Sequence, residues 1–131
     1  MSNLDKALQS LFTSYSEIKV AILFGSIAAG RETYDSDLDL AIATSEPLTI
    51  ENKQSLVAEL VNISGRPIDL IDLNTAPITV FRQALTKGKL IYCLDRSLYA
   101  ELIKKMIFDQ ADFMPYRERI LNERRRAWIS N

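Results

Sequence analysis

The sequence of 131 residues contains no histidine and a single cysteine, Cys93. Without histidine, the chain has no Ser-His-Asp or Cys-His catalytic site, no His-ligated zinc site and no imidazole general base. One cysteine excludes an internal disulfide, and its apolar setting in KLIYCL indicates a buried strand residue rather than a nucleophile. Any chemistry must therefore use carboxylates, hydroxyls, backbone donors and Lys or Arg, and such oxygen ligands favour hard cations, Mg²⁺ above all.

Long hydrophobic runs and strong net charge are also missing. No run approaches the roughly 20 apolar residues of a membrane span, and the opening MSNLDKAL lacks the apolar core of a signal peptide. The formal net charge of -1 gives no overall attraction to nucleic acids. We therefore expect a cytoplasmic protein that does not contact membranes and does not bind nucleic acid directly.

The hydrophobic pattern predicts alternating helices and strands. Helices are expected over residues 3–16, 49–63, 75–87 and 95–113, with a last basic helix to about residue 129. Strands are expected over residues 19–24, 37–43, 67–73 and 89–94. This order predicts an α/β (α+β) fold, with a small mixed sheet of three to four strands flanked by helices. We expect a single domain over residues 1–131, with a core at about 17–95 and a C-terminal helical extension over about 96–131.

Two aspartates separated by one residue, Asp37 and Asp39, open the second expected strand. Because side chains alternate along a strand, both carboxylates point to the same face, about 6.5 Å apart. Like charges at this distance repel each other unless a cation lies between them. The pair therefore predicts a Mg²⁺ site completed by phosphate oxygens, and the alternative is two solvated aspartates at a strand start.

A Gly-Ser turn precedes this pair. Gly25 allows a sharp turn after the first strand, and the Ser26 hydroxyl and the amides that follow are suited to phosphate. The alternative is an ordinary strand-to-helix turn. The spacing from Gly25 to Gly30 also matches the start of a P-loop, but Arg31 and Glu32 stand where Lys and Ser or Thr are required. This mismatch argues against a P-loop NTPase.

A third carboxylate is needed if two metal ions serve both the attacking and the leaving oxygens. The stretch PIDLIDL offers Asp69 and Asp72, which are three residues apart and therefore cannot share one strand face. An aspartate in the middle of a buried strand is costly without a partner, so Asp69 is preferred. Asp72 is then left to serve the strand end or the nucleotide.

The spacing G-S-x10-D-x-D, carried by Gly25, Ser26, Asp37 and Asp39 and followed by a later strand aspartate, resembles the polymerase β-like nucleotidyltransferase superfamily. Within it, FGSIAAG, SDLDLAI and PIDLIDLNTAP resemble the minimal nucleotidyltransferases (MNT), and the similarity covers about residues 20–95. The chain length and the C-terminal DFMPYRERILNERRRAWI are more particularly similar to MNT antitoxins that are encoded beside HEPN toxins.

The resemblance implies a nucleotidyltransferase fold in which Asp37, Asp39 and Asp69 hold two Mg²⁺ ions. It also implies that the Gly25-Ser26 turn grips the β- and γ-phosphates of a nucleotide. In the antitoxin group, a tyrosine hydroxyl of the HEPN RNase attacks the α-phosphate of ATP. Pyrophosphate leaves, the third carboxylate assists deprotonation, and the transferred AMP silences the toxin.

Two arginines, Arg31 and Arg66, are candidates for contacts with phosphate or nucleotide, and the alternative for each is a surface arginine. The C-terminal tail mixes apolar and arginine side chains, so we expect it to dock on a partner protein through Trp128. RNA contact by its arginines, or a solvated helix face, are the alternatives.

Two functions other than protein adenylylation remain open from the sequence. One is a non-catalytic module that binds nucleotide and masks the toxin sterically. The other is a nucleotidyltransferase that acts on a small molecule or RNA. Three carboxylates favour an enzyme over a masking module, because a pure binder has no reason to hold repelling charges together.

Overall fold

The computed structural model describes residues 3–33 and 36–108. The chain divides into a unit of residues 1–99 and a second of residues 100–131. The elements are α1 (Asn3–Phe12), β1 (Ile18–Phe24), α2 (Gly25–Ala28), β2 (Leu38–Thr44), α3 (Ile50–Ser64), β3 (Ile68–Asp72), α4 (Ile78–Lys87), β4 (Lys89–Cys93) and a helix over residues 96–108. The expected last helix, its arginines and Trp128 lie outside the described residues.

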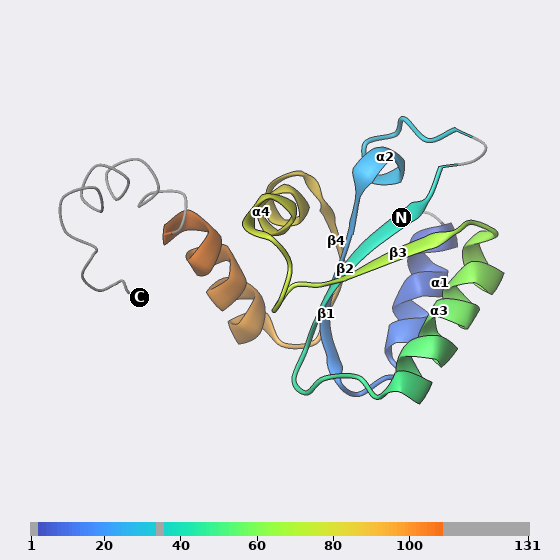
Figure 1. Ribbon diagram of the computed structural model, residues 1–131, viewed down its shortest axis with the longest axis horizontal. Helices are drawn as coiled ribbons and strands as arrows, with labels where there is room; N and C mark the ends of the chain where they lie inside the picture. Colours follow the sequence, from blue (N-terminus) through green and yellow to red (C-terminus); the bar gives the residue numbers. More distant parts are fainter. Residues whose placement is uncertain (1–2, 34–35, 109–131) are drawn as a thin grey trace. The chain divides into compact units, whose positions relative to one another are not determined.

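The four strands form one sheet in the order β3-β2-β1-β4. β1 is antiparallel to both β2 and β4, whereas β2 and β3 are parallel, so the expected mixed sheet is confirmed. Helices α1 and α3 lie side by side on one face of the sheet, and α4 packs against β1 on the other (Figure 1). Of the described helices, none is both long and apolar enough to span a bilayer.

The strand β2 shows how the two sheet faces differ. Leu38, Leu40 and Ile42 point into the core beneath α1 and α3, where they meet the buried side chains of Phe12 and other residues. The alternate positions, Asp39 and then Ala41 and Ala43, face the side covered by α4. Asp39 therefore lies on the face opposite the main core, at the end where the chain enters β2.

The expected strands are confirmed, and each of their ends lies within one residue of its expected position. Two caps are confirmed around α3: Thr49 Oγ1 accepts the Asn52 N–H at 3.0 Å, and Gly65 ends the helix with φ +69°. Asp95 caps the helix over residues 96–108 by accepting the Leu98 N–H at 3.0 Å.

The helix expected over residues 3–16 is wrong at its end, because α1 stops at Phe12. The Tyr15 N–H donates to Phe12 O at 3.1 Å, so the chain tightens into a three-residue turn there. This turn buries the Tyr15 ring, and its hydroxyl donates to Glu59 Oε1 of α3 at 2.6 Å.

The helix expected over residues 75–87 is wrong at its start, because α4 begins at Ile78. Asp72 organises a turn instead: its backbone carbonyl accepts the Thr75 N–H at 3.1 Å, and its Oδ1 accepts the Asn74 N–H at 2.9 Å. A side chain that bonds the backbone two residues on offers an alternative to helix formation.

Cys93 lies in a strand as expected but is half-buried rather than buried. Its strand, β4, is an end strand of the sheet and has a neighbour on one side only. The Gln9 side chain of α1 donates to Ile91 O at 2.9 Å, at the point where the register between β1 and β4 shifts.

Candidate active site

Three carboxylates meet at one end of the sheet. Asp39 of β2 stands opposite Asp69 of β3 in the parallel register, so both side chains project from the same face. Asp37 lies one residue before β2. Burial, then the negative charges of Asp69 and Asp37, then a hydrogen bond to Asp69, raise the pKa of the Asp39 carboxyl above its ordinary value. The structure therefore brings together the three aspartates that the sequence singled out.

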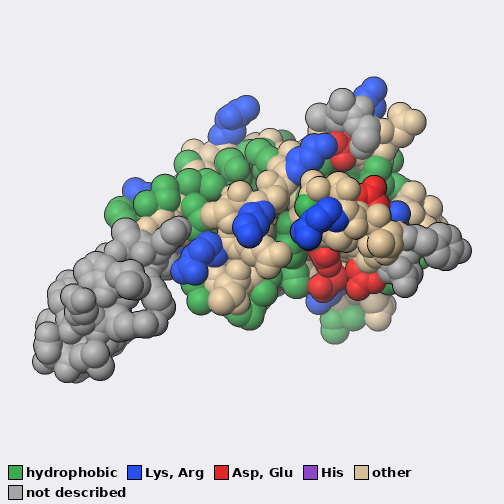
Figure 2. All heavy atoms as spheres, turned by 90° about the horizontal axis from the view of Figure 1, so that it is seen from above, with side chains coloured by type: hydrophobic (Ala, Val, Ile, Leu, Met, Phe, Trp, Pro, Cys, Tyr) green, Lys and Arg blue, Asp and Glu red, His purple; other side chains and the backbone are tan. Residues whose placement is uncertain are grey.

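The three carboxylates differ in exposure. Asp39 is half-buried, whereas Asp37 and Asp69 are exposed. On the face shown in Figure 2, acidic side chains lie at several places in the right-hand half, with lysine and arginine side chains among them. The cluster is thus open to a ligand from solvent, with Asp39 as its innermost member.

The Gly25 turn lies directly against Asp39. Phe24, the last residue of β1, is paired with Asp39 in the antiparallel register, and α2 begins at the next residue. Gly25 has φ +81°, and a Cβ placed on it would overlap Oδ2 of the Asp39 carboxylate. Two separate features therefore require glycine at position 25: the positive backbone angle, and the Asp39 carboxylate that fills the space of a side chain.

The two candidate arginines occupy different surroundings. Arg31 is exposed, and its backbone N–H donates to Ser26 O at 2.8 Å, which closes the turn after α2. The Arg66 side chain instead bonds the loop before β2: its Nη1 donates to Thr33 O at 2.9 Å and to Ser36 O at 3.0 Å. Sequence reasoning did not predict this contact, because it joins residues about 30 positions apart with no motif to mark it.

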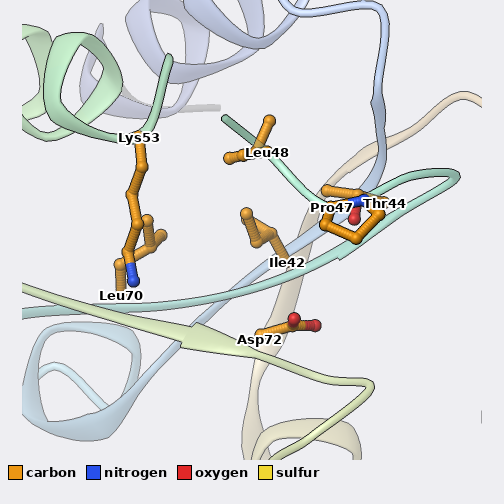
Figure 3. Close-up of a pocket in the computed structure, with 7 residues that line it drawn as sticks. All are labelled: Ile42, Thr44, Pro47, Leu48, Lys53, Leu70 and Asp72. Carbon is orange, nitrogen blue, oxygen red and sulfur yellow. The ribbon is translucent and has the colours of Figure 1, made fainter. Parts of the chain in front are cut away.

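Asp72 is not brought to the cluster. It stands opposite Ile42 in the parallel register, so it projects toward the α1/α3 side of the sheet rather than the Asp39 side. There it lines a cavity of about 140 Å³ together with Lys53 and Leu70 (Figure 3). Its bond to the Asn74 N–H agrees with a role at the strand end, and its predicted contact with nucleotide has no support in this geometry.

The carboxylate cluster suits a cation that arrives with its substrate. Within the ranges that the structure covers, no three Cys, His, Asp or Glu side chains form a ready-made metal cage. Mg²⁺ usually takes one or two protein carboxylates and completes its octahedron with water and substrate phosphates. The Asp39 and Asp69 oxygens, with the Asp37 charge beside them, are hard ligands whose mutual repulsion a cation would relieve. The residues present therefore fit a hard cation whose remaining ligands are water molecules or substrate phosphates.

Removing the Asp39 charge should stabilise the metal-free protein. Because the pKa of Asp39 is raised in the folded state, its ionisation lowers the free energy of unfolding as the pH rises through the folded-state pKa. We expect Asp39→Asn to melt above wild type at neutral pH in EDTA, because the asparagine side chain carries no charge at any pH. Below about pH 3, where the aspartate is protonated in both states, the difference should close. Calorimetry from acid to neutral pH measures this difference in melting temperature. A difference that does not change with pH would contradict the explanation by the Asp39 charge.

The comparisons with known proteins begin with a family model described as Polymerase beta, Nucleotidyltransferase, which matches residues 6–97. This chain belongs to that nucleotidyltransferase family. It is 27% identical over 90 residues to the protein adenylyltransferase MntA of Shewanella oneidensis, and the match covers 69% of this chain. It spans 65% of that relative, slightly less than two thirds of its length.

Solved structures agree with the nucleotidyltransferase fold. A chain of a toxin–antitoxin complex crystallised with AMP-PNP superposes with a TM-score of 0.72 at 23% identity, covering 92% of this chain and 97% of that one. A complex of the tri-AMPylated Shewanella oneidensis HEPN toxin with MNT antitoxin gives a TM-score of 0.67 at 20% identity, over 91% and 93% of the two chains. The expected fold class is therefore confirmed.

Proposed function

We propose that this nucleotidyltransferase is an antitoxin that uses Mg²⁺ to transfer AMP from ATP to a tyrosine hydroxyl of a HEPN RNase toxin. The observation that carries the proposal is the Asp39–Asp69 carboxylate pair, held on adjacent strands beside the Gly25 turn. The adenylyltransferase name of the relative MntA and the AMPylated toxin in the similar complex support the donor and the partner. Because ATP is the donor, we place the reaction in the cytoplasm.

The reaction is a displacement at the α-phosphorus. A bond forms between the tyrosine oxygen and the α-phosphorus, and the bond to the bridging oxygen breaks, so that pyrophosphate leaves. Mg²⁺, held by Asp37, Asp39 and Asp69, would supply charge neutralisation on the phosphates and on the leaving group. The Gly25-Ser26 turn would hold the β- and γ-phosphates.

The different exposure of the carboxylates supports separate roles for Asp39 and Asp69. Asp39 is half-buried against Gly25, so it is placed to hold and orient rather than to meet a second protein. Asp69 is exposed on the neighbouring strand and can reach an incoming hydroxyl, whose proton it would accept. Positioning and charge neutralisation provide most of the catalysis of such transfers, so a site without histidine is sufficient.

The experiment is a mass measurement on the toxin. The purified chain is incubated with ATP, Mg²⁺ and a HEPN toxin encoded beside it, and the toxin's intact mass and RNase activity are followed together. We expect AMP additions that parallel the loss of RNase activity and that disappear with Asp39→Asn. Inhibition of the RNase with no added mass, retained in Asp39→Asn, would contradict the transferase and indicate steric masking.

A further inference from the structure

Arg66 lies outside the carboxylate cluster, but hydrogen bonds join its side chain to the loop that precedes Asp37. It is half-buried and lies between α3, which Gly65 ends, and the start of β3. Its Nη1 donates to two carbonyl oxygens of the loop that leads into β2, Thr33 O at 2.9 Å and Ser36 O at 3.0 Å. One guanidinium nitrogen therefore uses both of its protons on that loop.

The backbone next to Arg66 completes the connection. The Leu38 N–H donates to Pro67 O at 2.8 Å. Asp37 thus has a bonded residue on each side: Ser36 is held by the Arg66 side chain, and Leu38 is held by the carbonyl of the following proline. The Asp37 side chain itself stays exposed at the cluster.

We propose that Arg66 is a positioning residue that fixes Asp37 for metal binding, rather than a ligand of the nucleotide phosphates. The inference rests on the proposed use of Asp37 as a metal ligand. Asp37 lies one residue before β2, so strand pairing holds the chain only on its Leu38 side, and the Arg66 bond to Ser36 O holds the chain on its other side. A ligand that is already ordered loses less conformational entropy when the metal binds.

The guanidinium group matters for this role. Its planar fork presents two N–H groups in a fixed direction, and both carbonyls of the loop lie within hydrogen-bond distance of the same nitrogen. Lysine carries the same charge on a flexible stem without that fixed fork. Arg66→Lys should therefore restore only part of what Arg66→Ala removes.

The experiment measures Mn²⁺ binding to the free protein by electron paramagnetic resonance, with no nucleotide or toxin present. We expect Arg66→Ala to weaken Mn²⁺ binding roughly 10-fold, the lower end of the losses seen when residues that orient metal ligands are removed. Arg66→Lys should fall between Arg66→Ala and wild type. Lys53→Ala is the matched control, because Lys53 is an exposed cation of α3 that lines the cavity on the opposite sheet face. This control should bind as wild type.

A double-mutant cycle separates positioning from a general effect on charge or folding. In an Asp37→Ala background, Arg66→Ala should weaken Mn²⁺ binding no further. Hydrogen exchange should show the Ser36 amide, which donates to Thr33 O in the loop that Arg66 holds, less protected in Arg66→Ala, with the β1 amides unchanged.

Several results would overturn the inference: an undiminished Arg66→Ala effect in the Asp37→Ala background, an equal loss in Lys53→Ala, or no Mn²⁺ binding by wild type. If wild type transfers no AMP but the cycle gives the expected coupling, the proposed function fails and the positioning role stands. If transfer occurs and Arg66→Ala leaves Mn²⁺ binding unchanged, the positioning role fails and the proposed function stands.

Discussion

Asp69→Asn is expected to reduce AMP transfer by roughly 10²–10³-fold, the size of effect found when one preorganised group at a reaction centre is removed. The reason is geometric, since Asp69 is the exposed partner of Asp39 across the parallel β2–β3 register. The substitution preserves the shape of the side chain and removes its charge and its ability to accept a proton. Transfer is measured as the initial rate of labelled AMP incorporation into the toxin at saturating ATP.

The matched control is Asp72→Asn, on the same strand and with the same change in charge. Asp72 projects from the other sheet face, and an asparagine oxygen there can still accept the Asn74 N–H. We expect this variant to transfer AMP within about twofold of wild type, because no group that touches the substrate changes. Equal losses in the two variants would contradict the assignment of the third carboxylate to Asp69.

Gly25→Ala should lower the rate of AMP transfer nearly as much as Asp69→Asn does. The added methyl group would occupy the space of the Asp39 carboxylate, so that either the turn or the carboxylate must move. A displacement of about 1 Å at a reacting centre can cost roughly 100-fold in rate, and we expect a loss of at least that size. The variant should also lose stability, because a residue with a Cβ is strained at φ +81° by about 1–2 kcal/mol.

Gly30→Ala provides the comparison that isolates the steric effect. Gly30 has a similar φ of +73°, but no atom lies within 4 Å of the position that its Cβ would take. Both variants should have a lower free energy of unfolding in urea, because alanine is strained in the left-handed backbone region. Only Gly25→Ala should lose AMP transfer. Comparable losses of transfer in both would show that backbone strain, and not the collision with Asp39, damages the site.

Much of the site was predictable from local sequence. The two-residue spacing predicted that Asp37 and Asp39 lie together, and the Asp37 charge indeed raises the Asp39 pKa, although Asp37 lies just before β2. The odd spacing of Asp69 and Asp72 required their side chains to point to opposite faces, as the strand register shows. The turn at Gly25 was recognisable because a glycine that follows an apolar strand permits the sharp change of chain direction that other residues resist. These features depend on periodicity and residue type within a single element, which a sequence displays directly.

Other features depend on pairing between distant segments. The contact of Gly25 with Asp39 follows from the register that joins Phe24 to Asp39, and no local pattern specifies that register. The bonds from Arg66 to the loop before β2 have the same character, which is why the arginine looked like a candidate for phosphate instead. The start of α4 at Ile78, later than the expected residue 75, has a local cause. The Asp72 side chain bonds the Asn74 N–H and forms a turn in place of the first helical residues.

The position of β3 at the end of the sheet affects how an acceptor could reach Asp69. Asp69 has a neighbouring strand on one side only, and the chain places no further strand beyond it among the residues described. As far as the described residues show, this edge is open laterally, so a folded protein could present a side chain to Asp69 without inserting a loop into an enclosed chamber. For the proposed toxin tyrosine, selection would then come from the fit between two protein surfaces and not from the dimensions of a pocket.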